Sequence, residues 1–134
     1  DSIKNALVKC SGELIAVHDG VRPLVELDTI KHCFAEAEKS GAAIPVVPIA
    51  ESMRRIILGG TEIVDRSDYL IVQTPQCFQR EILIAAYEQP YHAGITDDAS
   101  LVEQMGHVIE TISGNDSNIK ITTQSDLKYA GMFL

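Results

Sequence analysis

The sequence is poor in aromatic residues, in cysteine and in positive charge. Its 134 residues contain no tryptophan and 5% aromatics, and its formal net charge at pH 7 is −8. The eleven lysines and arginines are scattered along the chain. Nucleic-acid grooves need dense basic side chains, so this composition argues against a general polyanion-binding protein. Any phosphate-binding site must therefore be local.

Paired cysteines and long apolar runs are also missing. Cys10, Cys33 and Cys77 lie far apart in the sequence. This spacing suggests neither a zinc site nor a disulfide framework, and a reducing cytoplasm fits it best. No apolar stretch approaches the length of a membrane span, and the chain does not open as a signal peptide does. We expect one soluble domain, since 134 residues with 46% hydrophobic content can bury a single core.

Helical and strand patterns alternate, which favours an α/β fold with a mixed or parallel sheet covered by helices. Asp28, Thr96 and Ser125 are the expected first residues of three helices, and Gly41 ends the first of them. Prolines predict that strand 43–49 is an edge or irregular strand. The full set of expected helices is 1–9, 28–41, 79–89, 96–106 and 125–133, and of strands 13–18, 43–49, 69–72, 108–112 and 118–122.

Two runs with β-branched residues, 52–58 and 61–65, flank Gly59-Gly60. A two-glycine link between such runs is a strong hairpin signal. A lone hairpin leaves two open edges and is too small to be stable by itself. The hairpin therefore either packs against a partner subunit or folds back on its own domain.

Residues 16–23 read Ala-Val-His-Asp-Gly-Val-Arg-Pro and mark the end of an apolar strand. In open α/β sheets, ligands bind beyond the carboxyl ends of the strands, so Asp19 and Arg22 are expected to face a crevice together. A carboxylate there can hold magnesium or a sugar hydroxyl, and a guanidinium can bind phosphate oxygens. A salt bridge that only ties down the loop is the alternative.

Two other charged positions have plainer interpretations. Lys120 lies between two isoleucines, and the pattern alone favours a solvated lysine on an edge strand. Asp97 and Asp98 suit the first turn of a helix. Capping is preferred over metal binding for this pair, because neighbouring helical positions point about 100° apart.

Five motifs occur in the order seen in 2-C-methyl-D-erythritol 4-phosphate cytidylyltransferases, and the chain resembles that family over nearly its whole length. The motifs are Val-His-Asp-Gly-Val-Arg-Pro, Asp65-Arg66-Ser67, Gln73-Thr74-Pro75-Gln76, Thr96-Asp97-Asp98-Ala99-Ser100 and Asn118-Ile119-Lys120-Ile121-Thr122. The start Asp1-Ser2-Ile3-Lys4-Asn5-Ala6-Leu7 also resembles a helix start of the family.

The resemblance implies a Rossmann-like nucleotidyltransferase fold, a three-layer α/β sandwich with a protruding β-hairpin arm. It implies one domain over 1–134, with an arm at 51–66 that reaches across a homodimer to the neighbouring active site. The implied reaction transfers a cytidylyl group from CTP to 2-C-methyl-D-erythritol 4-phosphate, with Mg²⁺ and release of pyrophosphate, in the non-mevalonate isoprenoid pathway. Positioning and charge neutralisation carry such a transfer.

The resemblance also implies roles for individual residues. Ser2 would contact the cytidine, and Asp19 and Arg22 would lie beside the sugar phosphate, with Asp19 the candidate metal ligand. Lys120 and Arg66 are the candidate catalytic residues; both hold the substrate phosphate with Thr74, and Arg66 comes from the arm of the other subunit. Ser52 takes an arm position where threonine is more usual. Gly20 replaces the usual alanine, which changes loop stiffness rather than chemistry.

The family's amino-terminal strand and glycine-rich loop, which clamp the triphosphate, have no counterpart in the sequence. Gly59-Gly60 lacks the strand-to-helix context and the adjacent lysine of a phosphate cradle. We therefore expect a truncated chain that binds the sugar phosphate and by itself fails at turnover. Two alternatives stay open: a ribitol-5-phosphate cytidylyltransferase, and a non-catalytic dimerising remnant.

Overall fold

A computed structural model describes residues 2–90 and 94–133, so Asp1 of the first expected helix lies outside the described residues. The helices are α1 (Ser2–Leu7), α2 (Leu27–Ser40), the 3-10 helix η1 (Arg66–Asp68), α3 (Arg80–Glu88), α4 (Asp98–Glu103) and α5 (Gln124–Ala130). The strands are β1 (Leu14–Val17), β2 (Ala42–Pro48), β3 (Arg54–Ile57), β4 (Gly60–Ile63), β5 (Leu70–Val72), β6 (Gln76–Gln79) and β7 (Glu110–Ser113).

The main sheet is mixed, and β2 lies inside it. One side of β2 pairs antiparallel with β6 and then with β5, while the other side pairs parallel with β7. β1 extends the sheet by antiparallel pairing with β6. The expectation that 43–49 is an edge or irregular strand was therefore wrong. Pro45 is tolerated because it lies where the neighbour changes from β6 to β5, and its carbonyl still accepts from the backbone N–H of Gln73 at 2.8 Å.

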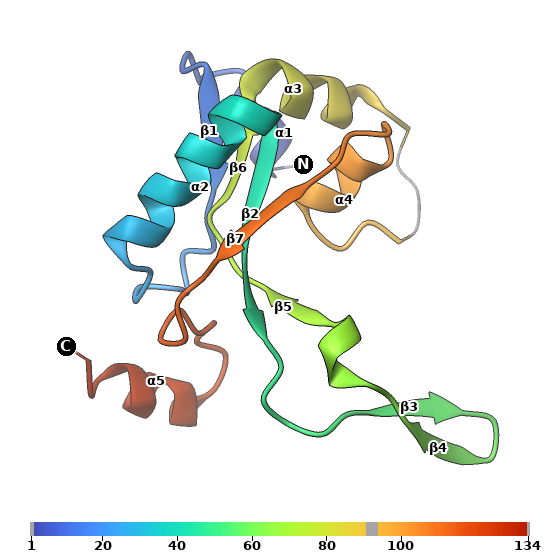
Figure 1. The fold of residues 1–134 in the computed structure, drawn as a ribbon. Helices are drawn as coiled ribbons and strands as arrows, with labels where there is room; N and C mark the ends of the chain where they lie inside the picture. Colours follow the sequence, from blue (N-terminus) through green and yellow to red (C-terminus); the bar gives the residue numbers. More distant parts are fainter. Residues whose placement is uncertain (1, 91–93, 134) are drawn as a thin grey trace.

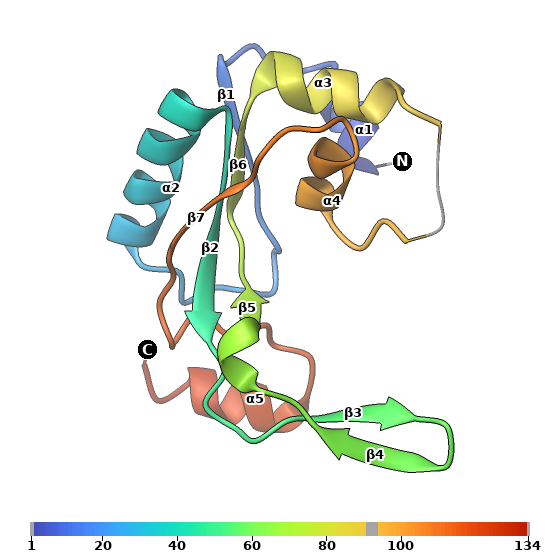
Figure 2. The same cartoon turned by 45° about the vertical axis from the view of Figure 1, so that its right-hand side comes forward.

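Helices cover both faces of this sheet, which makes three layers. Figure 2 shows α2 on one side of the strands, with α1, α3 and α4 on the other. Alternate residues of β2 enter the two cores: Ala42 and Ile44 pack with the three-helix side, and Ala43 packs with Cys33 of α2. The expected three-layer α/β sandwich is confirmed.

Helix ends follow local chemistry, although two predicted caps are shifted. Gly41 ends α2 with φ 96°, the left-handed conformation that glycine tolerates best. Asp28 was predicted to start α2, but Glu26 occupies the cap position and Asp28 lies in the first turn. Asp97, rather than Thr96, caps α4 by accepting the backbone N–H of Ser100.

The last helix also begins before its predicted start at Ser125. Thr123 is the cap of α5, and its side chain accepts the backbone N–H of Asp126. The Asp126 carboxylate in return accepts the N–H of Thr123, which completes a capping box. Sequence patterns locate such a helix more reliably than they locate its first residue.

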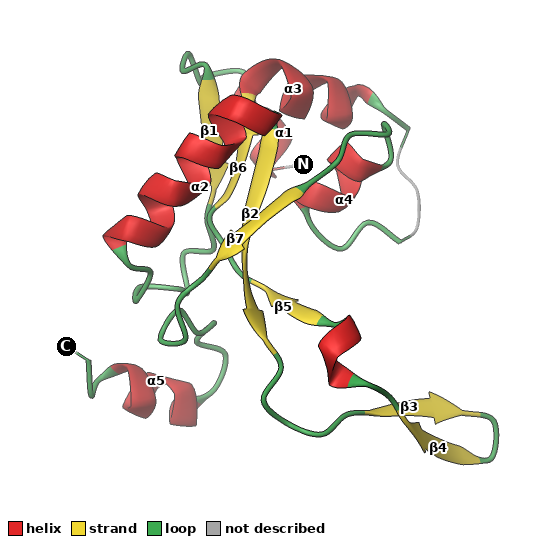
Figure 3. Ribbon diagram, viewed as in Figure 1, coloured by secondary structure: helices red, strands yellow, loops and turns green. Residues whose placement is uncertain are grey.

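The predicted hairpin is confirmed, and it projects from the body as an arm (Figures 1 and 3). β3 and β4 pair antiparallel, with Arg55 opposite Glu62. Gly59 has φ 84° in the connecting turn, where the missing Cβ removes the steric penalty. The paired segments are shorter than the runs expected from the sequence. This arm extends away from the three-layer body, so it does not fold back on it.

Two further expectations were wrong. Residues 118–122 form no strand in the structure; instead the segment follows the sheet edge as a loop, held by the Ile121 N–H donated to the Val21 carbonyl at 2.9 Å. β5 was expected in the core, but Leu70, Ile71 and Val72 are all exposed. Helices cover the other end of the sheet and leave β5 open beside the arm (Figure 1). Among the described residues, no helix is long and apolar enough to cross a membrane.

Candidate active site

Four of the predicted site residues line one cavity of about 530 Å³ at the edge of the sheet: Asp19, Arg22, Thr74 and Lys120. Asp19 and Arg22 follow β1, and Thr74 lies between β5 and β6. Lys120 comes from the loop after β7. Neighbouring chain segments of the sheet thus bring together residues that lie far apart in the sequence.

Asp19 is the centre of a small charge cluster. Its Oδ2 atom lies 3.1 Å from Nε of Arg22 and 3.3 Å from Nζ of Lys120. Partial burial raises the pKa of Asp19, but hydrogen bonds and charges from Arg22 and Lys120 outweigh that effect, so the pKa lies below its usual value. The carboxylate is therefore charged at neutral pH and orients two cations toward the cavity.

Lys120 is consequently not the isolated solvated lysine that the pattern alone favoured. Its side chain is half exposed, but its ammonium group is paired with Asp19. Arg22 is more deeply set, with 11% of its side chain exposed. The guanidinium also donates from Nη1 to the carbonyl of Asn118 at 2.8 Å. Two cations at one carboxylate leave a net positive charge that suits a phosphate ligand.

Thr74 and His18 fix the backbone of the Asp19 loop. The Thr74 hydroxyl accepts the backbone N–H of Asp19 at 3.0 Å and lies 2.9 Å from Nδ1 of His18. The other ring nitrogen, Nε2, lies 3.0 Å from the carbonyl of Arg22, which can only accept. In a neutral imidazole, Nε2 therefore donates and Nδ1 accepts the Thr74 hydroxyl.

Part of the cavity wall comes from the start of α4, where the sequence favoured helix capping over metal binding. Thr96, Asp97 and Asp98 line the cavity together with Gln76 of β6. Asp97 caps the helix through one oxygen and accepts Nε2 of Gln76 at 2.8 Å through the other. The run Thr96-Asp97-Asp98 after a glycine-containing link was the signal that could have placed these residues at the site.

Asp98 is buried and accepts the hydroxyl of Tyr87. Burial is the main cause that raises the pKa of Asp98, and the charge of Asp97 adds to it, while the Tyr87 hydrogen bond opposes both. Burial also raises the pKa of Tyr87. This pair therefore forms a buried hydrogen bond in the cavity wall, and the engaged carboxyl group is less suited to metal binding.

The other predicted residues lie apart from this cluster. Ser2 is exposed on α1, next to Ile3, which lines the cavity. Ser52 and Arg66 lie at the base of the arm, and the Arg66 guanidinium donates to the carbonyl of Ala50. Within one chain, the structure does not bring Ser52 or Arg66 to Asp19.

A metal ion would have few protein ligands here. In the described part of the chain, no group of three His, Cys, Asp or Glu side chains could hold one. Both ion pairs of Asp19 use Oδ2, so among the described residues Oδ1 has no ion-pair partner. Magnesium commonly takes only one or two carboxylates together with substrate phosphates, so Asp19 fits such a role.

The chain is similar in sequence to a known protein family and to several of its members. The chain matches the family model described as "IspD: 2-C-methyl-D-erythritol 4-phosphate cytidylyltransferase" over residues 1–134. It is 46% identical to the 2-C-methyl-D-erythritol 4-phosphate cytidylyltransferase of Phocaeicola vulgatus over 134 residues, which is 99% of this chain and 61% of the relative. The Porphyromonas gingivalis protein of the same name is 49% identical over 135 residues, again 99% of this chain and 61% of the relative. The chain thus spans about three fifths of these relatives' length.

Solved structures show the same fold. The crystal structure of 2-C-methyl-D-erythritol 4-phosphate cytidylyltransferase from Thermus thermophilus superposes with a TM-score of 0.90 at 31% identity, covering 98% of this chain and 66% of that one. The Francisella tularensis structure of that name gives a TM-score of 0.86 at 30% identity, covering 99% and 66%. These names do not favour the ribitol-phosphate alternative. With its motifs, its three-layer fold and a match along its whole length, this chain belongs to the 2-C-methyl-D-erythritol 4-phosphate cytidylyltransferase family.

Proposed function

We propose that the protein transfers a cytidylyl group from CTP to 2-C-methyl-D-erythritol 4-phosphate and releases pyrophosphate. The observation that carries this proposal is the cluster of Asp19, Arg22 and Lys120 at one cavity, in a chain of this family. In this reaction, a phosphate oxygen of the sugar forms a bond to the α-phosphorus of CTP, and the bond to pyrophosphate breaks. The protein's task is to hold the attacking phosphate and offset its charge.

Each cavity residue has a distinct part in that task. Arg22 and Lys120 bind the phosphate of the sugar, and Asp19 keeps both cations oriented while the substrate is absent. Thr74 holds the Asp19 loop and adds a hydroxyl to the cavity wall. Ser2 contacts the cytidine from α1, where its neighbour Ile3 already lines the same cavity.

Magnesium fits this site through Asp19. The Oδ1 oxygen of Asp19 would supply one ligand, as magnesium commonly takes one or two carboxylates together with substrate phosphates. The ion would neutralise charge on the triphosphate. The three cysteines are free thiols, which suits a reducing compartment such as the cytoplasm.

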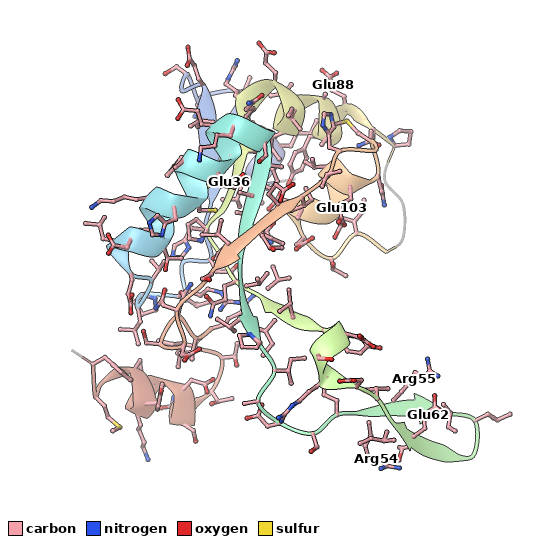
Figure 4. The ribbon with its side chains drawn as sticks, viewed as in Figure 1. Glu36, Arg54, Arg55, Glu62, Glu88 and Glu103 are labelled. Carbon is pink, nitrogen blue, oxygen red and sulfur yellow. The ribbon has the colours of Figure 1, made fainter. Side chains whose placement is uncertain are left out.

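The arm at 51–66 mediates a homodimer in this proposal. Figure 4 shows Arg54, Arg55 and Glu62 on the arm, far from the three-layer body. Arg55 pairs with Glu62 across the hairpin, while Ile56 is 86% exposed. An exposed aliphatic side chain on a projecting hairpin suits burial against a second copy.

The dimer would also complete the active site. Arg66 and Ser52 lie at the base of the arm and away from the cavity of their own chain. Crossing of the arms would bring both residues to the partner's cavity, where Arg66 would hold the sugar phosphate together with Lys120. The domain formed by 1–134 thus contributes to two sites, one through its cavity and one through its arm.

Pyrophosphate release tests the proposal. The assay contains CTP, 2-C-methyl-D-erythritol 4-phosphate and magnesium, and it compares this chain with the product of its complete open reading frame. We expect turnover from the longer protein and weak or no turnover from residues 1–134. Absence of turnover from both, with sugar-phosphate binding also absent by calorimetry, would contradict the proposed function and favour the non-catalytic alternative. Ribitol 5-phosphate is the matched substrate control.

A further inference from the structure

A closed ring of four hydrogen bonds lies at one end of the cavity. The backbone N–H of Asp19 donates to Oγ1 of Thr74 at 3.0 Å, and Nδ2 of Asn118 donates to the carbonyl of Thr74 at 2.8 Å. Arg22 closes the ring: Nη1 donates to the carbonyl of Asn118 at 2.8 Å, and Nε donates to Oδ2 of Asp19 at 3.1 Å. Three members line the cavity, whereas Asn118 is 0% exposed.

The side chain of Asn118 is used through its donor group. Nδ2 also donates to Oε1 of Gln73 at 3.3 Å, so both of its hydrogens are engaged. By contrast, Oδ1 is buried and has no hydrogen-bond partner among the described residues. A buried acceptor without a partner is unfavourable by roughly 1–3 kcal/mol. The side chain of Asn118 therefore acts through the two hydrogen bonds that Nδ2 donates, to the Thr74 carbonyl and to Gln73.

Asn118 adds a second connection between the Asp19–Arg22 loop and the link between β5 and β6, beside the direct bond from Asp19 to Thr74. Its side chain holds the link between β5 and β6, while its backbone carbonyl holds the Arg22 guanidinium. Lys120 follows two residues later and reaches Asp19. A shift of the Asn118 segment would therefore move both cations of the cavity together.

We propose that Asn118 is a positioning residue of this site: it sets the separation between the Arg22 guanidinium and the Thr74 hydroxyl. The ring uses Nε and one hydrogen of Nη1, and these two bonds fix the plane of the Arg22 guanidinium. Nη2 is not used by the ring and is available to a phosphate oxygen. Preorganised donors lose little rotational freedom when the ligand binds. The inference rests on the proposed function only in taking the ligand of Arg22 to be the sugar phosphate.

Asn118→Ala in the protein from the complete open reading frame is the first test. We expect KM for 2-C-methyl-D-erythritol 4-phosphate to rise about five- to tenfold. The substitution removes the Nδ2 donor to the Thr74 carbonyl, and this releases the segment whose backbone carbonyl orients Arg22. KM for CTP should change less than about twofold, since CTP is not held by the ring. Asn118→Leu, which keeps the branched shape and similar volume, is the second variant should alanine destabilise the fold.

Asn115→Ala is the matched control. Asn115 is nearly as buried and holds the same loop, but through Leu24 and Ser117 rather than through the ring. It should lower Tm as much as Asn118→Ala does while leaving KM for the sugar phosphate within about threefold. Equal KM changes in the two variants would show that Asn118 acts only on stability and would overturn the inference.

A measurement without substrate separates this inference from the proposed function. The Nε–Hε signal of Arg22 in a nitrogen-15 NMR spectrum should be sharp and slow to exchange in the parent protein and in Asn115→Ala. It should broaden or exchange quickly in the Asn118 variants. An unchanged Arg22 signal in those variants would overturn the positioning role. Loss of the signal together with a parent protein that transfers no cytidylyl group would leave the positioning role intact and reject the reaction.

Discussion

Nζ of Lys120 lies 3.3 Å from Oδ2 of Asp19, although Lys120 comes from the loop after β7 and Asp19 from the loop after β1. Arg22 approaches the same oxygen at 3.1 Å. One carboxylate therefore orients both cations, and the cluster can exchange this internal partner for a phosphate.

Arg22→Lys should lower kcat/KM for the sugar phosphate by about 10- to 100-fold despite the retained charge. The guanidinium binds Asp19 and the carbonyl of Asn118 at the same time, and a lysine ammonium lacks this planar set of donors. Steady-state kinetics with each substrate varied in turn would measure the change. Near-normal turnover would show that only the charge at this position matters.

Arg66→Ala should weaken use of 2-C-methyl-D-erythritol 4-phosphate more than CTP binding, by about tenfold or more in KM. The reason is the proposed position of Arg66 in the neighbouring subunit's cavity. Arg55→Ala is the control, because Arg55 also lies on the arm but pairs with Glu62. Equal losses toward both substrates in Arg66→Ala would contradict its assignment to the sugar phosphate.

Ile56→Asp should convert the proposed dimer to a monomer in sedimentation velocity experiments. Ile56 is 86% exposed on the arm, and Ile63 lies on the same face of the hairpin by register. A charge there opposes burial against a second copy. Val108→Asp changes an aliphatic side chain that is 72% exposed outside the arm, and it should leave the dimer intact. A parent protein that is monomeric at assay concentrations would refute the proposed assembly.

The Tm of Asp98→Asn should rise relative to the Tm of the parent protein as the pH increases from 4 to 7. Burial raises the pKa of Asp98 in the folded state, so the folded protein holds this proton more tightly than the unfolded chain does. That contribution is fully present below the usual aspartate pKa and is lost as pH rises through the raised value. Thermal unfolding of both proteins across this range measures the difference in Tm.

Asp126→Asn supplies a control of opposite sign for the Asp98 experiment. Hydrogen bonds from Thr122 and Thr123 hold the pKa of Asp126 below its usual value. Its stabilising contribution is therefore present above the usual aspartate pKa and is lost as pH falls through the lowered one. A Tm difference for Asp98→Asn that does not vary with pH would mean that Asp98 is not a buried, proton-holding group.

Local sequence signals predicted most helices and strands correctly, but they did not predict how β2 is paired or how exposed β5 is. Gly59 between two short β-branched runs predicted the hairpin, and Gly41 predicted the end of α2. Pro45 suggested an edge strand, yet β2 is paired on both sides, because a change of neighbour accommodates the missing N–H. The apolar residues of β5 indicated a core strand, but no local pattern shows which end of a sheet the helices cover.

For the site, the sequence by itself determined the pair of Asp19 and Arg22, because three residues of separation at the end of an apolar strand place them together. The family motifs added Thr74 and Lys120. Only the tertiary structure decided that Lys120 reaches Asp19, that Thr96 and Asp98 line the same cavity, and that the buried Asn118 binds the link between β5 and β6. These contacts depend on the pairing of β2 with β5 and β7, which fixes loops that are distant in sequence at one edge of the sheet.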